Sequence, residues 1–354
     1  MNKVETAPKI TKETKNSIRV DFERTPLLER LKARFVNVYF FQKVLVYVFK
    51  FLFLLGISYV ILFPFYSKIS SSFMSAEDFV DVTVNMVPRH PTLATYKAII
   101  LDNNYWKAFL NTLLLAGSCA ILQTFVCCLV GYGFAKFKFK GNGILFLVVI
   151  FTMIVPHQTL QLSMFMKFRY FDIGIGKFSI FNFLGGGLID SVNVLKDPWL
   201  RLINTFWPLI ILSATGLAFK NGLYIFMMRS FFKGIPDELE ESAYLDGSGT
   251  FRTFVQSILP LSIPMLITVF MFAFSWQWTD NYYTTVFFTT TGPLLMPKIV
   301  KVPKSLNTAY AGSNMYEAAI RNTCGILILL PLLILYTFMQ RYIVQGIERS
   351  GITG

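Results

Sequence analysis

Long apolar runs recur along the chain and are separated by shorter polar stretches. Each run is roughly 20 residues or more, which is the length an α-helix needs to cross a ~30 Å hydrocarbon core at 1.5 Å per residue. The predicted spans are 45–66, 107–131, 142–163, 206–228, 258–278 and 323–343. The pattern therefore predicts an all-α polytopic membrane protein with six transmembrane helices.

Composition supports a membrane location and excludes a soluble domain. Of the 354 residues, 54% are hydrophobic and 15% are charged, and the mean hydropathy is +0.53. A soluble domain of this size has too little interior to bury so much apolar surface. All the cysteines lie in the apolar runs without metal-ligand spacing, so we expect buried free thiols at Cys119, Cys127, Cys128 and Cys324.

Lysine and arginine predict the orientation of the chain. Residues 1–43 hold ten of them against five acids, and Lys136, Lys138 and Lys140 follow the second span. By the positive-inside rule, these segments and both termini lie in the cytoplasm. We expect a basic tail over 1–43, partly disordered and leading to an interfacial helix. The net charge of +13 favours contact with anionic lipid over nucleic acid, because the basic residues lie at the ends of the spans.

A polar, acidic stretch at 238–261 separates two apolar runs. Pro236, Asp237 and Glu238 suit the start of a helix, since proline needs no N–H there and acids complement the dipole. Gly247 and Gly249 end that helix. A second helix is predicted from the spacing of its apolar positions, Phe251, Phe254, Val255 and Ile258. The stretch therefore predicts a helix–turn–helix element beneath the bilayer.

This element resembles the cytoplasmic EAA loop of permease subunits from binding-protein-dependent ABC importers. Ser242 and Ser257 depart from the family pattern, but the spacing of the motif is kept. The resemblance implies that the element couples the permease to an ATPase. The implied coupling residues are Glu240, Glu241, Ser242, Ala243, Asp246, Gly247, Leu259 and Pro260.

Other stretches extend the resemblance over residues 45–354. Gly131–Lys136, Phe226–Phe232 and Trp278–Asp280 are similar to family segments, and the glycine-rich end is similar to that of the smaller permease of maltose-type importers. The resemblance implies a transmembrane domain over 44–350 with a core at 107–346, in a bacterial inner or plasma membrane. It also implies a second homologous permease, two cytoplasmic ATPase subunits, an extracytoplasmic solute-binding protein and a sugar substrate.

No sequence pattern indicates catalysis or a cofactor. His90 and His157 have no partners at metal or nucleophile spacing, and no Walker A loop is present. We therefore expect neither an enzyme nor a cofactor or metal site, and expect ATP to bind to other subunits. The alternative function is a secondary carrier or channel acting without ATPase subunits, and a membrane-bound enzyme is a weaker alternative. The coupling element could also be a partnerless interfacial helix.

Two features of the spans leave alternatives open. Lys220 and Asn221 interrupt the fourth span, so they either line a translocation path or occupy a structural irregularity of the helix. The aromatic residues Trp276, Trp278, Tyr282 and Tyr283 favour an interfacial belt over a sugar platform.

An external insertion is predicted at 175–201, compared with the family pattern. It either extends the docking surface for the binding protein or lies passively at the membrane interface without a functional role.

Overall fold

A computed structural model describes residues 38–169, 202–288, 292–306, 308 and 313–351, and four short strands outside these ranges. The chain divides into two compact units, Met1–Lys68 and Ile69–Gly354. The strands form two antiparallel hairpins, β1 (Ile10–Glu13) with β2 (Arg19–Phe22) and β3 (Gly174–Ile175) with β4 (Phe178–Ser179). The rest of the basic tail before residue 38, and of the insertion at 175–201, lies outside the described residues.

The described ranges are otherwise helical, which confirms the predicted fold class. The first half holds α2 (Val38–Ser72), α3 (Ala94–Asp102), α4 (Tyr105–Lys136), α5 (Asn142–Ile154), η1 (His157–Leu160) and α6 (Gln161–Arg169). The second half holds α8 (Trp207–Ala214), α9 (Asn221–Lys233), α10 (Glu238–Leu245), α11 (Thr250–Thr253), η3 (Phe254–Ile258), α12 (Leu259–Leu261), α13 (Ile263–Trp278), α14 (Tyr282–Phe287), η4 (Met296–Ile299) and α15 (Asn314–Gly351).

The count of six continuous spans is not reproduced in the described residues. Three helices are long and apolar enough to cross a bilayer: Phe41–Ser72, Tyr105–Lys136 and Asn314–Gly346. Two bent pairs raise the number to five if each counts as one span, namely Asn142–Ile154 with His157–Arg169 at 91° and Thr250–Leu261 with Ile263–Trp278 at 75°. The first bend follows from Pro156, which lacks an N–H and disfavours helix at the residue before it.

The predicted fourth span is broken rather than continuous. Helix α8 ends at Ala214 and α9 begins at Asn221. Between them the backbone is left-handed at Gly216 (φ 76°) and Lys220 (φ 69°), a conformation that stops an α-helix.

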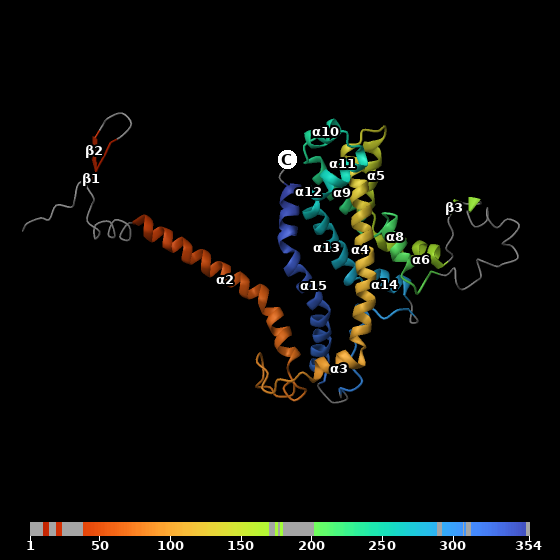
Figure 1. Cartoon of the computed structure of the whole chain (residues 1–354). Coiled ribbons are helices and arrows are strands. Elements are labelled where there is room, and N and C mark those ends of the chain that lie inside the picture. Colours follow the sequence, from red (N-terminus) through yellow and green to blue (C-terminus); the bar gives the residue numbers. More distant parts are fainter. Residues whose placement is uncertain are drawn as a thin grey trace, which may run out of the picture. The chain divides into compact units, whose positions relative to one another are not determined.

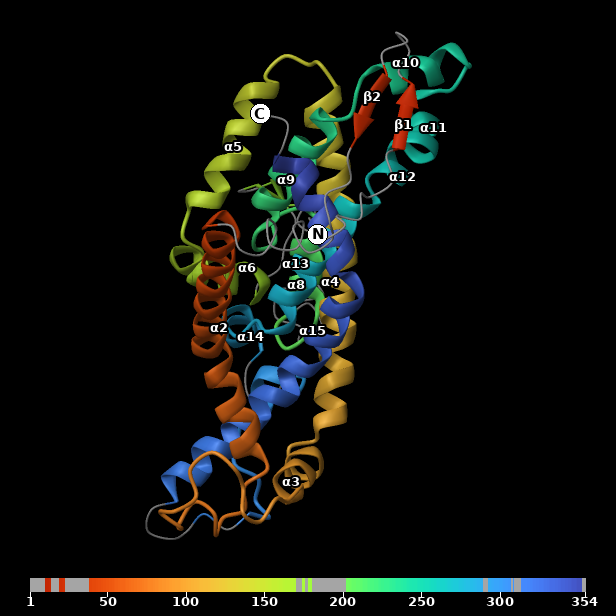
Figure 2. The same cartoon turned by 90° about the vertical axis from the view of Figure 1, so that its left-hand side faces the viewer.

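The unit Ile69–Gly354 is built around α4, which packs against α8, α9 and α13, while α15 packs against α13 (Figures 1 and 2). Small residues on the buried face of α4 let these helices approach closely. At Gly131 an added Cβ would lie 2.6 Å from the Cβ of Met228 on α9, so only glycine fits there. The indole of Trp278 donates to the carbonyl of Ile328 at 2.9 Å and links α13 to α15.

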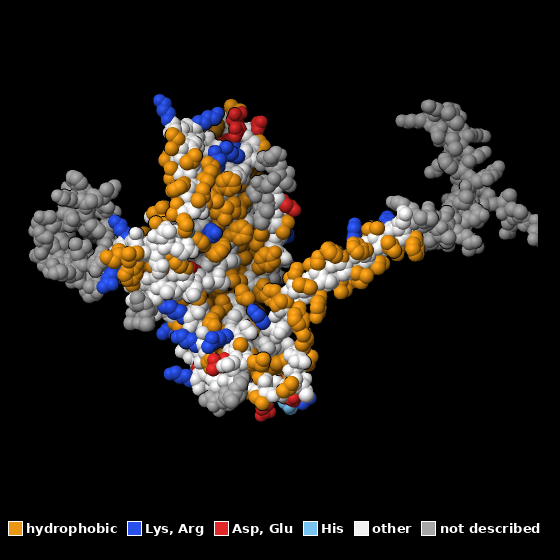
Figure 3. Space-filling view, turned by 180° about the vertical axis from the view of Figure 1, so that it is seen from behind, with side chains coloured by type: hydrophobic (Ala, Val, Ile, Leu, Met, Phe, Trp, Pro, Cys, Tyr) orange, Lys and Arg blue, Asp and Glu red, His pale blue; other side chains and the backbone are white. Residues whose placement is uncertain are grey.

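The two ends of this helical body differ in structure. Helices α10 and α11 lie at one end and α3 lies at the opposite end (Figure 1). Charged side chains gather at both ends, while hydrophobic side chains cover much of the surface between them (Figure 3). This distribution is expected for a body whose middle faces lipid.

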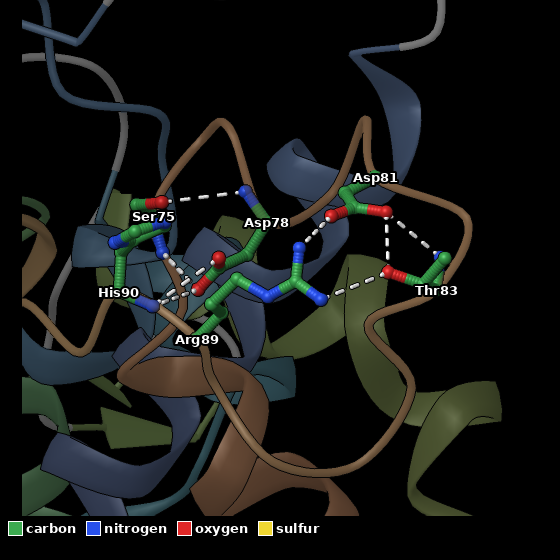
Figure 4. A network of polar contacts seen from close by, with 6 residues as sticks. All are labelled: Ser75, Asp78, Asp81, Thr83, Arg89 and His90. Atoms are coloured by element: carbon green, nitrogen blue, oxygen red, sulfur yellow. Dashed lines mark hydrogen bonds and ion pairs between the residues drawn. The ribbon is translucent and has the colours of Figure 1, made fainter.

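A polar network organises the loop between α2 and α3 (Figure 4). The buried carboxylate of Asp78 accepts hydrogen bonds from the backbone N–H groups of Ser75 and His90 at 3.2–3.4 Å. Arg89 donates to Asp81 at 2.7 Å. The pKa of Asp81 lies below its usual range because Thr83 donates to it through its hydroxyl and its backbone N–H. The network therefore joins residues 75–81 of the loop to residues 89–90.

Candidate coupling element and membrane cavity

Helix α10 has favourable charges at its start and a capping motif at its end. Its first turn carries Glu238, Glu240 and Glu241, which complement the positive end of the helix dipole. At its end, the N–H of Gly247 donates to Tyr244 O and that of Ser248 donates to Ala243 O, at 3.0 and 2.9 Å. This pair of bonds is a Schellman motif, and Gly247 supplies the left-handed residue that it needs, with φ 80°. The predicted helix and glycine turn are therefore present.

Lys136, the last residue of α4, holds α10 against the body. Its buried ammonium donates to the carbonyl of Ile235 at 2.7 Å and to the carboxylate of Asp237 at 2.6 Å. The carboxylate of Glu240 lies 4.0 Å away and is itself buried. The pKa of Asp237 lies below its usual range because Lys136 donates a hydrogen bond to it and adds a nearby positive charge. This contact was not anticipated from the sequence, where Lys136 indicated orientation and formed part of a stretch similar to the family but had no predicted partner.

The predicted coupling residues do not form one cluster. Glu240 faces the body beside Lys136 and Tyr132, whose ring packs against Phe254 at 4.6 Å. Leu259 and Pro260 open α12, away from α10 in the sequence. The others lie on the outer surface: Glu241, Ser242, Asp246 and Gly247 are exposed and Ala243 is half-buried.

The outer surface of this element carries exposed apolar side chains. Leu245, at the end of α10, is 89% exposed, and Phe251 in α11 is 77% exposed. The expected apolar face of the second helix divides in two, since Phe254 and Ile258 are buried whereas Phe251 and Val255 are exposed. The cause is the wider winding of η3, a π-helix, which shifts the face that 3.6-residue spacing predicts.

A cavity of about 240 Å³ lies within the body. Its lining comes from α4, η1, α8, α13, α14 and the turns beside them, and it combines amide, hydroxyl and aromatic side chains with the imidazole of His157 and the carboxyl group of Asp280. Gln123 donates to the hydroxyl of Ser213 at 3.3 Å, while the side-chain nitrogen of Gln277 is buried with no partner in the described part of the chain. Such a lining offers hydrogen-bonding groups beside aromatic faces, which suits a polar ligand.

The interfacial-belt interpretation of the aromatic residues is wrong for two of them. Trp278 is fully buried and Tyr283 is 5% exposed, with its hydroxyl 2.7 Å from Nδ1 of His157. Trp276 and Tyr282 line the cavity, and Tyr282 donates to the carbonyl of His157. Composition identifies aromatic residues near a helix end, but only tertiary packing decides whether they face lipid.

Lys220 and Asn221 lie at the break before α9. The ammonium of Lys220 is 4.8 Å from the ring centroid of Phe219 and 5.0 Å from that of Trp276. Lys220 lines a second cavity of about 500 Å³, which shares His157 and Phe219 with the first. The side chain of Asn221 is buried, and both of its polar atoms lack a hydrogen-bond partner among the described residues.

No group of three metal-ligating side chains occurs in the ranges that the structure describes. The four cysteines are free and buried there, as the sequence predicts.

Comparison with known proteins gives the family. The chain belongs to the binding-protein-dependent transport system inner membrane components, whose family model matches residues 127–349. It is therefore a multi-pass permease subunit of an ABC importer.

Two relatives from Bacillus subtilis match most of the chain. The probable ABC transporter permease protein YurM is 26% identical over 321 residues, covering 87% of this chain and 88% of the relative. The polygalacturonan/rhamnogalacturonan transport system permease protein YtcP is 24% identical over 311 residues, covering 85% of this chain and 96% of the relative.

A solved structure is also similar. The crystal structure of a bacterial ABC transporter involved in the import of the acidic polysaccharide alginate has a chain with a TM-score of 0.60 and 19% identity, covering 90% of this chain and 99% of that one. That likeness concerns the fold.

Proposed function

We propose that this permease carries a carbohydrate and that α10 couples the movement to ATP hydrolysis in other subunits. The observation that supports the coupling role is the pair Leu245 and Phe251, which are almost fully exposed on an acidic element at one end of the body. Leu239, Tyr244 and Val255 on the same element are also exposed, and a group of exposed apolar side chains is typical of a docking surface. An ATPase groove is the occupant that the family resemblance implies.

The contacts of α10 make it suited to transmit force. Lys136 ties it to the end of α4, and short connections join it to α9 before it and to α11 after it. Closure of two ATPase subunits below the membrane would therefore displace α4, α9 and α13 together. A second homologous permease would complete the path, and an extracytoplasmic binding protein would deliver the substrate.

The two cavities are the candidate translocation path. Gln123 and Gln277 bring side-chain amides to the first cavity, and Lys220, which lines the second, lies over the ring faces of Phe219 and Trp276. Amides beside exposed aromatic faces are the groups that bind sugars through hydroxyl hydrogen bonds and ring stacking. The names of the polygalacturonan relative and the alginate importer support a carbohydrate, including a long one.

Disulfide trapping tests the docking proposal. Leu245→Cys should crosslink to a cysteine in the ATPase groove in the assembled complex, and ATP should change the yield. Lys97→Cys on α3 is the matched control, because it is exposed at the opposite end of the body. If the purified chain transports sugar without ATPase subunits, the carrier alternative is correct and the proposal fails.

A further inference from the structure

A basic hollow lies at the α10 end of the body, beside the turn that joins α4 to α5. It has a volume of about 560 Å³, and its walls come from α4, the turn at 137–141, α5 and α9. Four of its lining residues are cations, Lys138, Lys140, Arg229 and Lys233, and none is acidic. The hollow is separate from the cavities assigned to the translocation path.

The cations of this hollow are not neutralised by the protein. No carboxylate of a described residue lies within 4.0 Å of the charged nitrogens of these four side chains. Lys138, Lys140 and Lys233 are exposed, so they are free to approach a ligand. Lys138 helps to lower the pKa of Asp237 through its positive charge, without forming an ion pair with it among the described residues.

Arg229 is fixed at the back of the hollow. Its guanidinium lies 3.7 Å from the ring centroid of Phe146, and its Nε donates to the carbonyl of Phe134 at 3.4 Å. The side-chain amide of Asn142 donates to the carbonyls of Phe134 and Phe137 and fixes the turn. The hollow is therefore preformed, with one anchored cation and three exposed ones.

Apolar surface continues from the hollow along α5. Ile144, Leu147 and Phe151 lie at i, i+3 and i+7 on one helix face, and they are 74%, 65% and 59% exposed. Phe137 and Phe139 flank the lysines and are also exposed. Figure 3 shows Lys and Arg side chains at this end of the body next to hydrophobic surface. A ligand that satisfies both regions has an anionic head and long apolar chains.

We propose that this hollow binds the phosphate of an anionic phospholipid whose acyl chains lie along α5. Basic clusters at the cytoplasmic ends of membrane helices attract anionic lipid, at about 1 kcal/mol per Lys or Arg. A soluble protein partner would leave the apolar face of α5 uncovered, whereas one phospholipid covers both the hollow and that face. The assignment to the cytoplasmic leaflet rests on the proposed function.

Native mass spectrometry of the whole importer complex tests this site. The complex is extracted from vesicles of equal parts phosphatidylglycerol and phosphatidylcholine, and the retained lipids are counted. The double variant Lys138→Gln/Lys140→Gln should retain phosphatidylglycerol about 30-fold less tightly than the wild type, which corresponds to about 2 kcal/mol for two lysines. The matched control is Lys43→Gln/Arg341→Gln, which removes the same charge from exposed positions elsewhere.

The outcomes separate lipid from other occupants. Selective loss of phosphatidylglycerol in the first variant, with the control unchanged, supports the site. Equal loss in both variants, no loss in either, or equal retention of phosphatidylcholine overturns it. Loss of copurifying ATPase subunits with lipid retention unchanged would assign the hollow to a protein contact and also overturn it. Because lipid is counted directly, the result does not depend on whether the complex transports sugar.

Discussion

The hydroxyl of Tyr105 donates a hydrogen bond to the carbonyl of Leu327 at 3.2 Å, and both groups are buried. Pro331 lies four residues after Leu327 inside α15 and has no N–H, so this carbonyl lacks its helical partner. An unpaired carbonyl is costly in hydrocarbon because no water is present to satisfy it. Tyr105, at the start of α4, therefore compensates for the proline in α15.

We expect Tyr105→Phe to destabilise the protein by about 1 kcal/mol, the scale of hydrogen bonds within membrane proteins. The measurement is the midpoint of denaturant-induced unfolding of the purified complex in detergent. In a Pro331→Ala background the alanine N–H pairs with Leu327, so the same Tyr105→Phe change should cost little. Equal costs in both backgrounds would contradict the compensation.

Gly247→Val should impair coupling, because a β-branched side chain disfavours φ 80° by about 1–2 kcal/mol. No atom lies within 4 Å of the added Cβ, so the effect is conformational and not steric. Gly249→Val is the matched control, since Gly249 also has open space but has φ −75°. We expect only Gly247→Val to lower sugar uptake per ATP hydrolysed, at normal membrane abundance. A similar loss in both variants would refute the importance of the left-handed turn.

Lys136→Met should loosen α10 by about 2 kcal/mol, because it leaves the buried Glu240 carboxylate without its cation. The measurements are the thermal midpoint of the complex and its ATPase stimulation by sugar-loaded binding protein. Adding Glu240→Gln to Lys136→Met removes the stranded charge and should restore part of both. Lys43→Met, at an exposed site, is the control for loss of a positive charge. The ion-pair account fails if the double variant is no better than Lys136→Met alone.

Lys220→Met should lower uptake without lowering membrane abundance if Lys220 lines the path. Methionine packs readily in apolar surroundings, but it cannot attract a polar substrate. Uptake of radiolabelled sugar is compared with abundance on immunoblots, and Lys97→Met at the exposed α3 surface serves as control. Parallel losses of uptake and abundance would favour the structural role.

Thiol labelling in intact cells checks the orientation. An impermeant reagent should modify Asn103→Cys, between α3 and α4, but neither Lys140→Cys nor Ser248→Cys. Background should be low because the four native cysteines are buried. Modification of Ser248→Cys in unbroken cells would reverse the orientation and place α10 outside.

The helix and glycine turn of the candidate coupling element were largely predictable because their signals are local. Caps, a glycine turn and a flanking proline each act within a few residues, so α10 and the turn at Gly247 follow from the sequence. Its anchor was not predictable, since Lys136 reaches Asp237 across 101 residues. The Gly131–Lys136 stretch resembles a family segment that includes this lysine, but the resemblance does not identify the residue that Lys136 contacts.

Helix continuity and burial were predicted less well. The fourth span is apolar enough to pass as one helix, and Lys220 and Asn221 indicate an interruption without showing a complete break. Trp278 was assigned to the interface because aromatic residues favour both lipid headgroups and protein interiors. Its hydrogen bond to Ile328 decides between them, and that contact depends on how α13 packs on α15.

The close approach at Gly131 has a mechanical consequence. The close packing of α4 on α9 at Gly131 and the hydrogen bond from Lys136 to the segment after α9 connect α4, α9 and α10 to one another. If ATPase subunits push on α10, as proposed above, these contacts would make α4, α9 and α10 move together. The flexibility that such a movement requires would then lie in the non-helical segment 215–220 between α8 and α9. This segment borders the two cavities.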